Sequence, residues 1–599
     1  MAKPQKTPNP GKRKLSLREA FRTLLKVWAY LADHKRTVFL VMLMVLLSSG
    51  FGLLGPYLVG HTIDEAIVAR RTGMLPLLLG LLAGVYVLHS ASLWLQNYWM
   101  IGAAQRTVYT MRQDLFRHLH RLPVSFFAKR QHGEIMSRIT NDIENVSQTL
   151  NSSVIQLFSS VLTFVGMLGL MLWLSPLLTL ITLTVVPAMF FGMKWITART
   201  SVHFKAQQKN IGSLNGFIEE TLSGQKIVKS FSREANVIAE FRERNAALRT
   251  SGYWAQVYSG FIPKLMNVLN NLSFAIIAGA GGLLATRDLV SIGVIVTFTE
   301  YARQFIRPLN DLANQFNTFL SAVAGAERVF EVLDEEAEEA DERDAEALAA
   351  TRGEIEFRSV SFSYSGDADT LANISFRVPP GTTAALVGPT GAGKTTIVQL
   401  LSRFYDADGG LILLDGRDIR TIKRQSLRRQ MGFVLQDPFL FQGTIRDNIR
   451  YGRLEATDEE VERAAKEANA HGFIVKLPQG YGTVIGGDGG GLSQGQKQLL
   501  SIARALLADP ALLILDEATS SIDTITELRI QEALYRLMKG RTNIVIAHRL
   551  NTIRRADQIL VLEEGRLIER GSHEELLRRD GFYAGLYKSQ FREEMPSSG

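Results

Sequence analysis

The eight residues from Gly388 to Thr395 read Gly-Pro-Thr-Gly-Ala-Gly-Lys-Thr and fit the pattern G-x-x-x-x-G-K-[ST]. In this pattern the glycines let backbone N–H groups close around phosphate oxygens, the lysine adds positive charge, and the last hydroxyl binds Mg²⁺. The apolar run 383–387 predicts a buried strand before the loop, and 396–403 predicts a helix whose N-terminus can hold an anion. A glycine-rich turn could match by chance, but this context favours a site for a nucleoside triphosphate with Mg²⁺.

Two carboxylates lie at the end of another apolar run. Residues 511–515 predict a buried strand, and Asp516 and Glu517 follow it. A carboxylate at a strand end beside the phosphate loop can hold Mg²⁺ through its water shell, and the next one can polarise an attacking water. His548 follows a third such run, 542–547, and is a candidate sensor of the terminal phosphate, although a histidine there can also be structural.

Composition narrows the class of protein. The chain has 599 residues, enough for several domains, and a net charge of +8. It has no cysteine, which excludes disulfides, thiolate metal sites and cysteine catalysis. Much of the positive charge lies near the N-terminus, just ahead of an apolar run. This arrangement favours a cytoplasmic, membrane-facing N-terminus over a nucleic-acid contact.

Long uncharged runs are confined to the first half of the chain. Because about 20 apolar residues cross a bilayer, these runs predict five membrane spans; core helices of a large soluble protein rarely include so many. A sixth, weaker span carries Glu300 and Arg303, and an even number of spans keeps the basic N-terminus and the nucleotide-binding half on the cytoplasmic side. The six predicted spans lie near 37–60, 75–104, 154–174, 177–196, 265–285 and 289–310.

The other segments are arranged around these spans. Residues 106–153 and 194–264 are charged and helical in pattern, and we expect them to extend the spans into the cytoplasm. Residues 331–352 are acidic and predict a solvated linker, after which strands alternate with helices as in an α/β nucleotide-binding domain. The predicted parts are a disordered basic tail at 1–15, a transmembrane domain at 16–330 that begins with an amphipathic elbow helix, the linker at 331–352, an ATP-binding domain at 353–590 and a tail at 591–599.

With these motifs the chain resembles a half-transporter of the ATP-binding-cassette (ABC) exporter superfamily, from Ser16 to about Gln590. The resemblance implies a multi-domain fold. An N-terminal all-α domain of six transmembrane helices with long cytoplasmic extensions precedes a C-terminal α/β P-loop nucleotide-binding domain. The implied cofactors are ATP and Mg²⁺. The implied ATP-binding residues are Tyr364, which would stack on adenine, Gly388, Pro389, Thr390, Gly391, Ala392, Gly393, Lys394, Thr395, Thr396 and Gln436.

The resemblance also gives roles to the later motifs. It implies that Thr395, Gln436 and Asp516 hold Mg²⁺. Glu517 and His548 would be the catalytic residues, as the Walker B glutamate and the switch histidine. Ser521 and Asp523 would belong to the D-loop, and the signature segment would be Leu492, Ser493, Gln494, Gly495 and Gln496.

The signature segment departs from the family pattern. In the family two nucleotide domains pair head to tail, and the signature Leu-Ser-Gly-Gly-Gln of one acts on ATP held by the other. Gln494 stands where the first glycine belongs, and its side chain would crowd the approach of the backbone to a phosphate. The chain therefore resembles the subunit of a heterodimeric exporter that keeps a working Walker B and pairs with a partner whose Walker B is altered. A homodimer that tolerates Gln494 is the alternative.

The charges of the sixth span predict a substrate cavity. Glu300, Arg303 and Arg307 share one helix face, and a charge at the bilayer centre costs about 2.5–3.5 kcal/mol, so such residues usually turn inward. We predict that Glu300 and Arg303 line the cavity together with Asn267 and Asn271. The alternatives are that the arginines reach the inner interface instead and that the asparagines only join helices.

These features, with the resemblance, predict an ATP hydrolase that exports amphiphilic or hydrophobic molecules across the cytoplasmic (inner) membrane. The substrates would be drug-like molecules, lipids or peptides, the partner would be a second half-transporter, and no nucleic acid would be involved. The nucleotide domain and the N-terminus are expected in the cytoplasm. A homodimeric lipid flippase and an ATP-gated channel or regulator are the alternatives.

Overall fold

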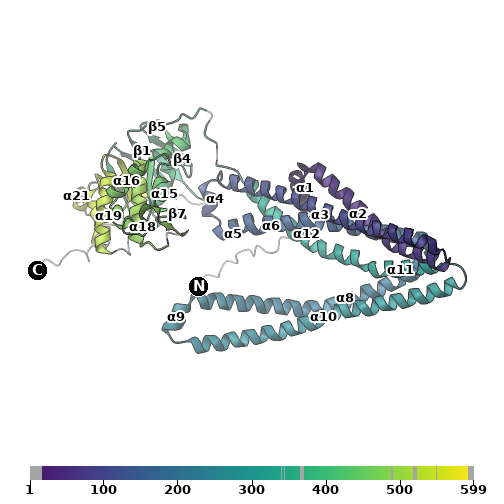
Figure 1. Ribbon diagram of the computed structural model, residues 1–599. Helices are drawn as coiled ribbons and strands as arrows, with labels where there is room; N and C mark the ends of the chain where they lie inside the picture. The colour runs from purple at the N-terminus through teal and green to yellow at the C-terminus, as the bar shows by residue number, and fades with distance from the viewer. Residues whose placement is uncertain are drawn as a thin grey trace. The chain divides into compact units, whose positions relative to one another are not determined.

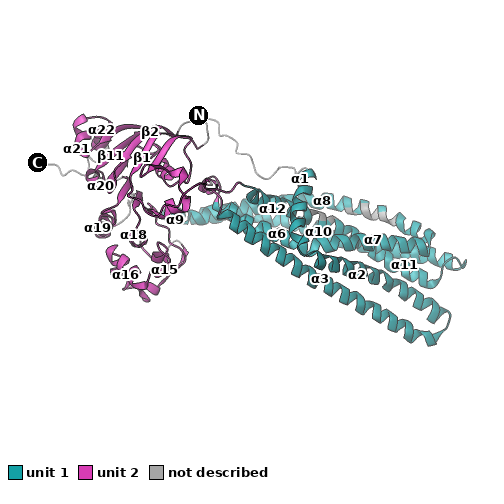
Figure 2. Ribbon diagram, turned by 90° about the horizontal axis from the view of Figure 1, so that it is seen from above, with its two compact units in different colours: residues 1–120, 132–335 teal, residues 121–131, 336–599 magenta. Residues whose placement is uncertain are grey.

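The computed structural model describes residues 17–338, 340–342, 344–364, 370–487, 490–516, 523–547 and 550–590. The chain folds into two units. Unit 1 combines residues up to 120 with 132–335, and unit 2 combines 121–131 with the residues from 336 onward (Figure 2). Unit 1 is helical, and unit 2 contains the strands together with shorter helices (Figure 1). The predicted fold class, a helical domain followed by an α/β domain, is confirmed.

Unit 1 begins with the amphipathic helix α1 (Leu17–Ala32). It buries Val27 and Leu31, while Phe21, Leu25 and Trp28 are exposed, as expected for a helix that lies along a membrane surface. The helices that follow in this unit are α2 (Lys35–Thr62), α3 (Leu75–Leu119), α5 (His132–Ser137), α6 (Ile143–Gln148), α7 (Val154–Leu174), α8 (Pro176–Ser223), α9 (Gln225–Ser230), α10 (Glu234–Ala285), α11 (Ile292–Gln304) and α12 (Ile306–Leu333).

Several of these helices are long and apolar enough to cross a membrane. In the described chain the stretches that meet this criterion are Lys35–Val68, Thr72–Leu119, His132–Leu174 and Glu234–Ala285. The predicted span at 177–196 lies at the start of α8, and the one at 289–310 covers α11 and the first residues of α12. Helices α3, α8 and α10 have 45, 48 and 52 residues, so they are longer than the about 20 residues that cross a bilayer. α8 and α10 pack along each other, and α9 connects their ends (Figure 1).

In the described part of unit 2 the strands form two main sheets. An antiparallel sheet has the order β2-β1-β4-β5, and a larger sheet has the order β12-β11-β3-β10-β9-β6, parallel except for β12. The strands are β1 (Ile355–Phe362), β2 (Leu371–Val378), β3 (Thr383–Val387), β4 (Gly409–Leu414), β5 (Arg417–Asp418), β6 (Met431–Val434), β9 (Leu512–Asp516), β10 (Thr542–Ile546), β11 (Gln558–Glu563) and β12 (Arg566–Gly571), with β7 (Gly443–Thr444) and β8 (Val484–Ile485) forming a separate pair.

The described helices of unit 2 carry several of the motifs, and some of them pack on the larger sheet. They are α13 (Lys394–Leu401), α14 (Arg424–Arg429), α15 (Ile445–Arg450), α16 (Asp458–Glu467), α17 (His471–Ile474), α18 (Gln494–Ala508), α19 (Thr524–Met538), α20 (Leu550–Arg555), α21 (His573–Arg579) and α22 (Phe582–Gln590), and the short α4 (Val124–Ala128) also belongs to unit 2.

The central strands are buried on both faces, as parallel strands usually are. Successive side chains point to opposite faces, so Ala384 and Leu386 of β3 join one core while Ala385 and Val387 join the other. The first core contains α13 and the antiparallel sheet, and the second contains α18 and α19. The sheet is therefore fixed from both sides, and the edge where its parallel strands end is a rigid platform for a site.

Candidate nucleotide site and membrane cavity

The phosphate loop connects the central strand β3 to helix α13, as the sequence predicted. Two glycines show why the loop needs this residue type. Gly388 has φ 154°, and a Cβ there would lie 2.1 Å from the carbonyl oxygen of Leu562. Gly393 has φ 96° in the left-handed region and caps the N-terminus of α13. The loop thus approaches its neighbours more closely than a side chain would allow, and α13 begins directly after it, so the N-terminus of that helix can face an anion.

Lys394 is held over this loop. Its ammonium donates hydrogen bonds to the carbonyl oxygens of Gly388 at 2.7 Å and Pro389 at 2.9 Å. Burial lowers the pKa of the Lys394 ammonium, and the nearby Asp516 carboxylate partly offsets that lowering. Thr395, the next residue, is exposed at the first turn of α13. A cation and a hydroxyl therefore lie at the helix N-terminus where phosphate oxygens would bind.

Asp516 and Gln436 lie at the same edge of the sheet as the loop. Asp516 is the last residue of β9 and is in register with Ile546 of β10, which is in register with Leu386 of β3. Gln436 is exposed two residues after β6, the strand on the other side of β9. The structure thus brings together the residues predicted to hold phosphate and metal, because parallel strands end at one edge.

Tyr364 lies beside the first helical turn after the loop. Its hydroxyl is 3.1 Å from Oγ1 of Thr396 and donates a short hydrogen bond to Gln399. Its ring packs edge-on against Phe362 and Tyr405, and the residue is 41% exposed. An aromatic face anchored in this way can stack on a nucleotide base.

The signature segment begins helix α18. Ser493 is the N-cap, and a reciprocal capping box joins it to Gln496, with the Ser493 N–H donating to Oε1 of Gln496 at 2.9 Å. Gln494 is the first helical residue and is exposed, whereas Gly495 is buried and Leu492 packs against the core. The departure from the family pattern therefore lies on an accessible helix N-terminus.

Sequence analysis did not identify Gln498, which links two motifs. Its amide donates to the carbonyl oxygen of Leu435, directly before Gln436, at 3.3 Å. The signal would have been its position one turn after Gln494 on the same helix.

Asp523 of the predicted D-loop accepts the N–H of Thr526 at 2.9 Å and caps α19, and this hydrogen bond lowers the pKa of the Asp523 carboxyl. Glu517, Ser521 and His548 lie outside the described residues.

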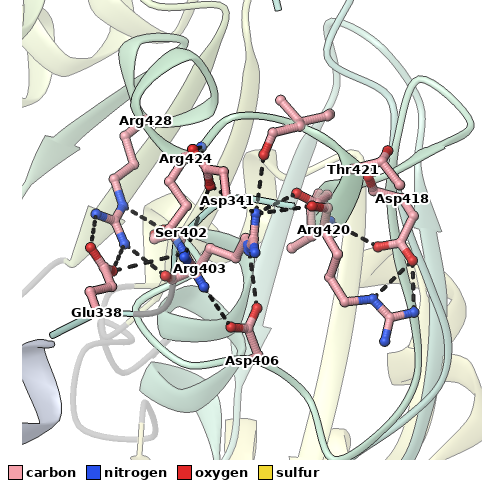
Figure 3. Close-up of polar contacts among 12 residues, drawn as sticks. Glu338, Asp341, Ser402, Arg403, Asp406, Asp418, Arg420, Thr421, Arg424 and Arg428 are labelled. Atoms are coloured by element: carbon pink, nitrogen blue, oxygen red, sulfur yellow. Dashed lines mark hydrogen bonds and ion pairs between the residues drawn. The ribbon is translucent and has the colours of Figure 1, made fainter. Parts of the chain in front are cut away.

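The segment predicted to be a solvated linker belongs to unit 2 from residue 336 onward and contacts three arginines there. We call Arg403, Arg424 and Arg428 with their acidic partners the linker cluster (Figure 3). Glu338 pairs with Arg428 at 2.6 Å, and Asp341 accepts the backbone N–H of Arg424 at 3.1 Å. Arg428 also donates to the carbonyl oxygen of Arg403 at 2.7 Å. The linker is thereby fastened to the end of α13, the helix that starts at the phosphate loop.

Arg403 organises this cluster from a buried position. It follows α13 with φ 53°, and its side chain is 4% exposed. The guanidinium donates to Asp406 at 3.0 Å and to the carbonyl oxygens of Ile419 and Ile422 at 3.1 Å each. Glu338 also donates its backbone N–H to the carbonyl oxygen of Arg121 at 2.7 Å, which joins residues 121–131 to the linker within unit 2.

Unit 1 contains a cavity of about 720 Å³. Residues from α2, α3, α7, α10, α11 and α12 line it, including Glu300, Arg303 and Arg307. Asn267 and Asn271 are exposed on α10 and do not belong to its described lining. The cavity gathers more polar side chains than the sequence had suggested, among them Ser48, His89, Gln156, Gln304 and Asp311.

Both halves of the chain match known families. The family described as ABC transporter transmembrane region matches residues 38–309, and the family described as ABC transporter matches residues 371–520. The second match contains the phosphate loop, the signature segment and Asp516, which lie together in unit 2.

Similar proteins match over nearly the whole chain. An uncharacterized ABC transporter ATP-binding protein of Bacillus subtilis, YfiC, is 62% identical over 97% of this chain and 96% of its own length. A fatty acid ABC transporter ATP-binding/permease protein of Mycobacterium tuberculosis is 45% identical over 88% of this chain and 82% of its own. An ATP-dependent lipid A-core flippase of Syntrophus aciditrophicus is 37% identical over 96% of this chain and 95% of its own.

A solved structure agrees with the fold. The structure of a bacterial Atm1-family ABC exporter with ATP bound has a TM-score of 0.73 and 32% identity, and the match covers 95% of this chain and all of that one. The family matches, these relatives and the shared fold lead to one assignment. The chain belongs to the ABC exporters as a half-transporter, an ATP-hydrolysing protein that spans the inner membrane several times and has its nucleotide domain in the cytoplasm.

Proposed function

We propose that this half-transporter is one subunit of a heterodimeric exporter of amphiphilic molecules, with one ATP site that hydrolyses and one that mainly holds ATP. The observation that carries the proposal is the exposed position of Gln494 at the start of α18. A glutamine there adds a side chain on the surface that faces a partner's ATP in this family, where glycine allows close approach. The chain's own phosphate loop and Asp516 are intact, so the impaired site would be the one that uses this signature.

At the working site the chain's own residues bind and orient ATP. The loop from Gly388 to Gly393 and Lys394 hold the phosphates. The exposed Thr395 hydroxyl and the Asp516 carboxylate, which is close enough to Lys394 to affect its pKa, are hard oxygen donors that suit Mg²⁺. Such an ion would neutralise phosphate charge when bound. Glu517 would accept the proton of the attacking water, and His548 would hold the terminal phosphate.

The cavity in unit 1 supports an amphiphilic substrate. It combines the apolar side chains of Leu93 and Phe274 with the charged side chains of Glu300 and Arg303. The names of two relatives, a fatty acid transporter and a lipid A-core flippase, denote proteins that act on amphiphiles. Closure of the nucleotide domains on ATP would turn this cavity outward, and hydrolysis would reset it.

The first test is Mg²⁺-dependent ATPase activity of the full chain in nanodiscs, alone and with the product of an adjacent transporter gene. We expect activity only with the partner, and a loss of about 10²–10⁴-fold in Glu517→Gln with ATP binding retained. Glu455→Gln, an exposed carboxylate elsewhere in unit 2, is the matched control and should keep full activity. Full activity of the chain alone would mean a homodimer and would contradict the asymmetric-site proposal.

Two other functions give different results when the chain is reconstituted into closed lipid vesicles, alone and with the partner. A homodimeric lipid flippase, which the 37% identity to the lipid A-core flippase favours, would work alone and be stimulated by its lipid. An ATP-gated channel would conduct ions without accumulating a substrate. Net accumulation that requires ATP and both subunits supports the proposed exporter over both.

A further inference from the structure

Two arginines line the unit 1 cavity without an acidic partner. Within the described residues, neither Arg303 nor Arg307 forms an ion pair with a carboxylate, and both are exposed. The contact recorded for Arg303 is with an aromatic ring, since its guanidinium lies 5.3 Å from the ring centre of Phe274. The cavity therefore holds two guanidinium groups whose hydrogen-bond donors are available.

The carboxylates of the same cavity accept hydrogen bonds from amides instead. Glu300 accepts a hydrogen bond from the amide nitrogen of Gln304 at 2.8 Å. Asp311 accepts one from the amide nitrogen of Gln156, 155 residues away in the chain, also at 2.8 Å. Glu300 lies three residues before Arg303, and Asp311 lies four after Arg307, spacings that allow ion pairs on a helix. Among the described residues, neither Glu300 with Arg303 nor Asp311 with Arg307 forms an ion pair.

The helix that carries Arg303 is fixed in rotation. On its opposite face Tyr301 is fully buried and donates to the carbonyl oxygen of Leu53 at 2.7 Å, and Thr297 donates to that of Pro56 at 3.2 Å. One turn earlier Gly293 packs closely on Gly60. A Cβ added to Gly293 would lie 2.0 Å from the carbonyl oxygen of Gly60. Because α11 is fastened to α2 in this way, Arg303 cannot leave the cavity by rotation of its helix.

The arginines lie deep in the span. Helix α11 starts after Ser291, whose hydroxyl donates at 2.5 Å to Asp64 in the π-helical segment Ile63–Val68 that continues α2. At 1.5 Å per residue, Arg303 is about 18 Å along α11 from this end, and Arg307 lies just beyond the end of α11, in the first turn of α12. With Ser291 at the outer boundary of a hydrocarbon core about 30 Å thick, Arg303 falls in the cytoplasmic half. A cation at such a depth is costly and is usually kept for a ligand.

We propose that Arg303 and Arg307 form the binding site for an anionic head of the exported amphiphile, a carboxylate or phosphate carried on an apolar chain. Guanidinium groups bind both anions through paired hydrogen bonds, and Phe274, Leu93 and Val296 offer apolar surface for the chain in the same cavity. The inference rests on the proposed export function and names its substrate class.

The test compares probes that share one hexadecyl chain and differ in the head: hexadecanoate, hexadecyl phosphate, hexadecylphosphocholine, hexadecanol and hexadecyltrimethylammonium. Binding to the full transporter in nanodiscs is measured against empty nanodiscs. We expect the two anionic probes to bind at least tenfold more tightly than the zwitterionic, neutral and cationic ones. Inorganic phosphate and acetate, which lack the chain, should not compete, and the two anionic probes distinguish a carboxylate substrate from a phosphate substrate.

The variants locate the site. Arg303→Gln with Arg307→Gln should remove the preference for anionic heads, and Arg303→Lys with Arg307→Lys should restore part of it. Arg287→Gln, an exposed arginine at the other end of the span, is the matched control and should bind like the unaltered protein. Equal binding of the cationic or zwitterionic probe, or an unchanged preference in the double glutamine variant, would overturn the inference. Binding is measured without ATP, so failure of ATP-driven transport with this preference intact would instead contradict the export function.

Discussion

The arginines of the linker cluster in unit 2 and those of the cavity in unit 1 have opposite surroundings. Arg403, Arg424 and Arg428 each pair with a carboxylate at 3.0 Å or less. In the cavity the described residues offer Arg303 and Arg307 no such pair, and the two carboxylates there accept hydrogen bonds from amides. Arginines in the linker cluster thus donate their hydrogen bonds to groups of the protein, whereas the cavity arginines have donors available for a ligand.

The difference separates structural charges from charges kept for a ligand. A guanidinium that is paired and hydrogen-bonded when buried repays part of its desolvation, and removing it leaves its partners unsatisfied. A guanidinium without a partner at membrane depth adds no such stability and costs free energy. Residue type alone does not distinguish the two roles; the identity of the hydrogen-bond partners does.

The largest expected effect is the loss of stability in Arg403→Met. The change removes the guanidinium that donates to the carbonyl oxygens of Ile419 and Ile422, and it leaves the Asp406 carboxylate with Arg424 as its remaining arginine partner. Breaking one side of a buried pair should cost about 3 kcal/mol. For a domain of this size that lowers the melting temperature by roughly 6–12 °C. The melting temperature is measured by heating the full transporter in nanodiscs and monitoring unfolding of the nucleotide domain by its proteolysis.

The matched cavity variant should behave differently. Arg303→Met removes a cation with no carboxylate partner among the described residues, so we expect the melting temperature to stay within about 2 °C or to rise. Equal losses of stability in the two variants would break the comparison, since Arg303 would then also have a structural role.

The motifs of the nucleotide site could be predicted because their signals are local. The run 383–387 is β3, and the runs at 511–515 and 542–547 lie within one residue of β9 and β10. Apolar runs with polar ends define such strands, and their shared direction brings Asp516 and Gln436 to the loop. The helix predicted at 396–403 begins at Lys394 and ends at Leu401, because Arg403 takes a left-handed conformation.

The charge pairing in both regions could not be predicted. The acidic composition of 331–352 indicated a solvated linker, but Asp341 bonds to Arg424, 83 residues later. Likewise the shared face of Glu300 and Arg303 was visible in their spacing, whereas the amide that binds Asp311 comes from Gln156. Such pairs depend on which distant elements pack together, and no local pattern in one sequence records that.

A smaller effect is expected from the linker itself. Asp341→Asn weakens the acceptor for the backbone N–H of Arg424, and because the Asp341 side chain is 29% exposed, the cost should be about 1–2 kcal/mol. Hydrogen exchange of the amides in 336–346 should rise about 5- to 30-fold. Asp334→Asn, at a more exposed acid before this segment, is the control. Unchanged exchange would mean that the linker cluster does not hold the linker in solution.

The smallest effect tests whether the amides keep the cavity arginines available. Gln156→Leu removes the donor to Asp311, whose carboxylate is then free to compete with an anionic head for Arg307. We expect the affinity for hexadecanoate to fall about threefold, the scale of an exposed ion pair of less than 1 kcal/mol. Adding Asp311→Asn removes the competitor, so the double variant should regain the original affinity. If the affinity for hexadecanoate stays low in the double variant, Gln156 contacts the ligand directly. The hydrogen bond from Gln156 to Asp311 would then not explain why Arg307 is free to bind an anion.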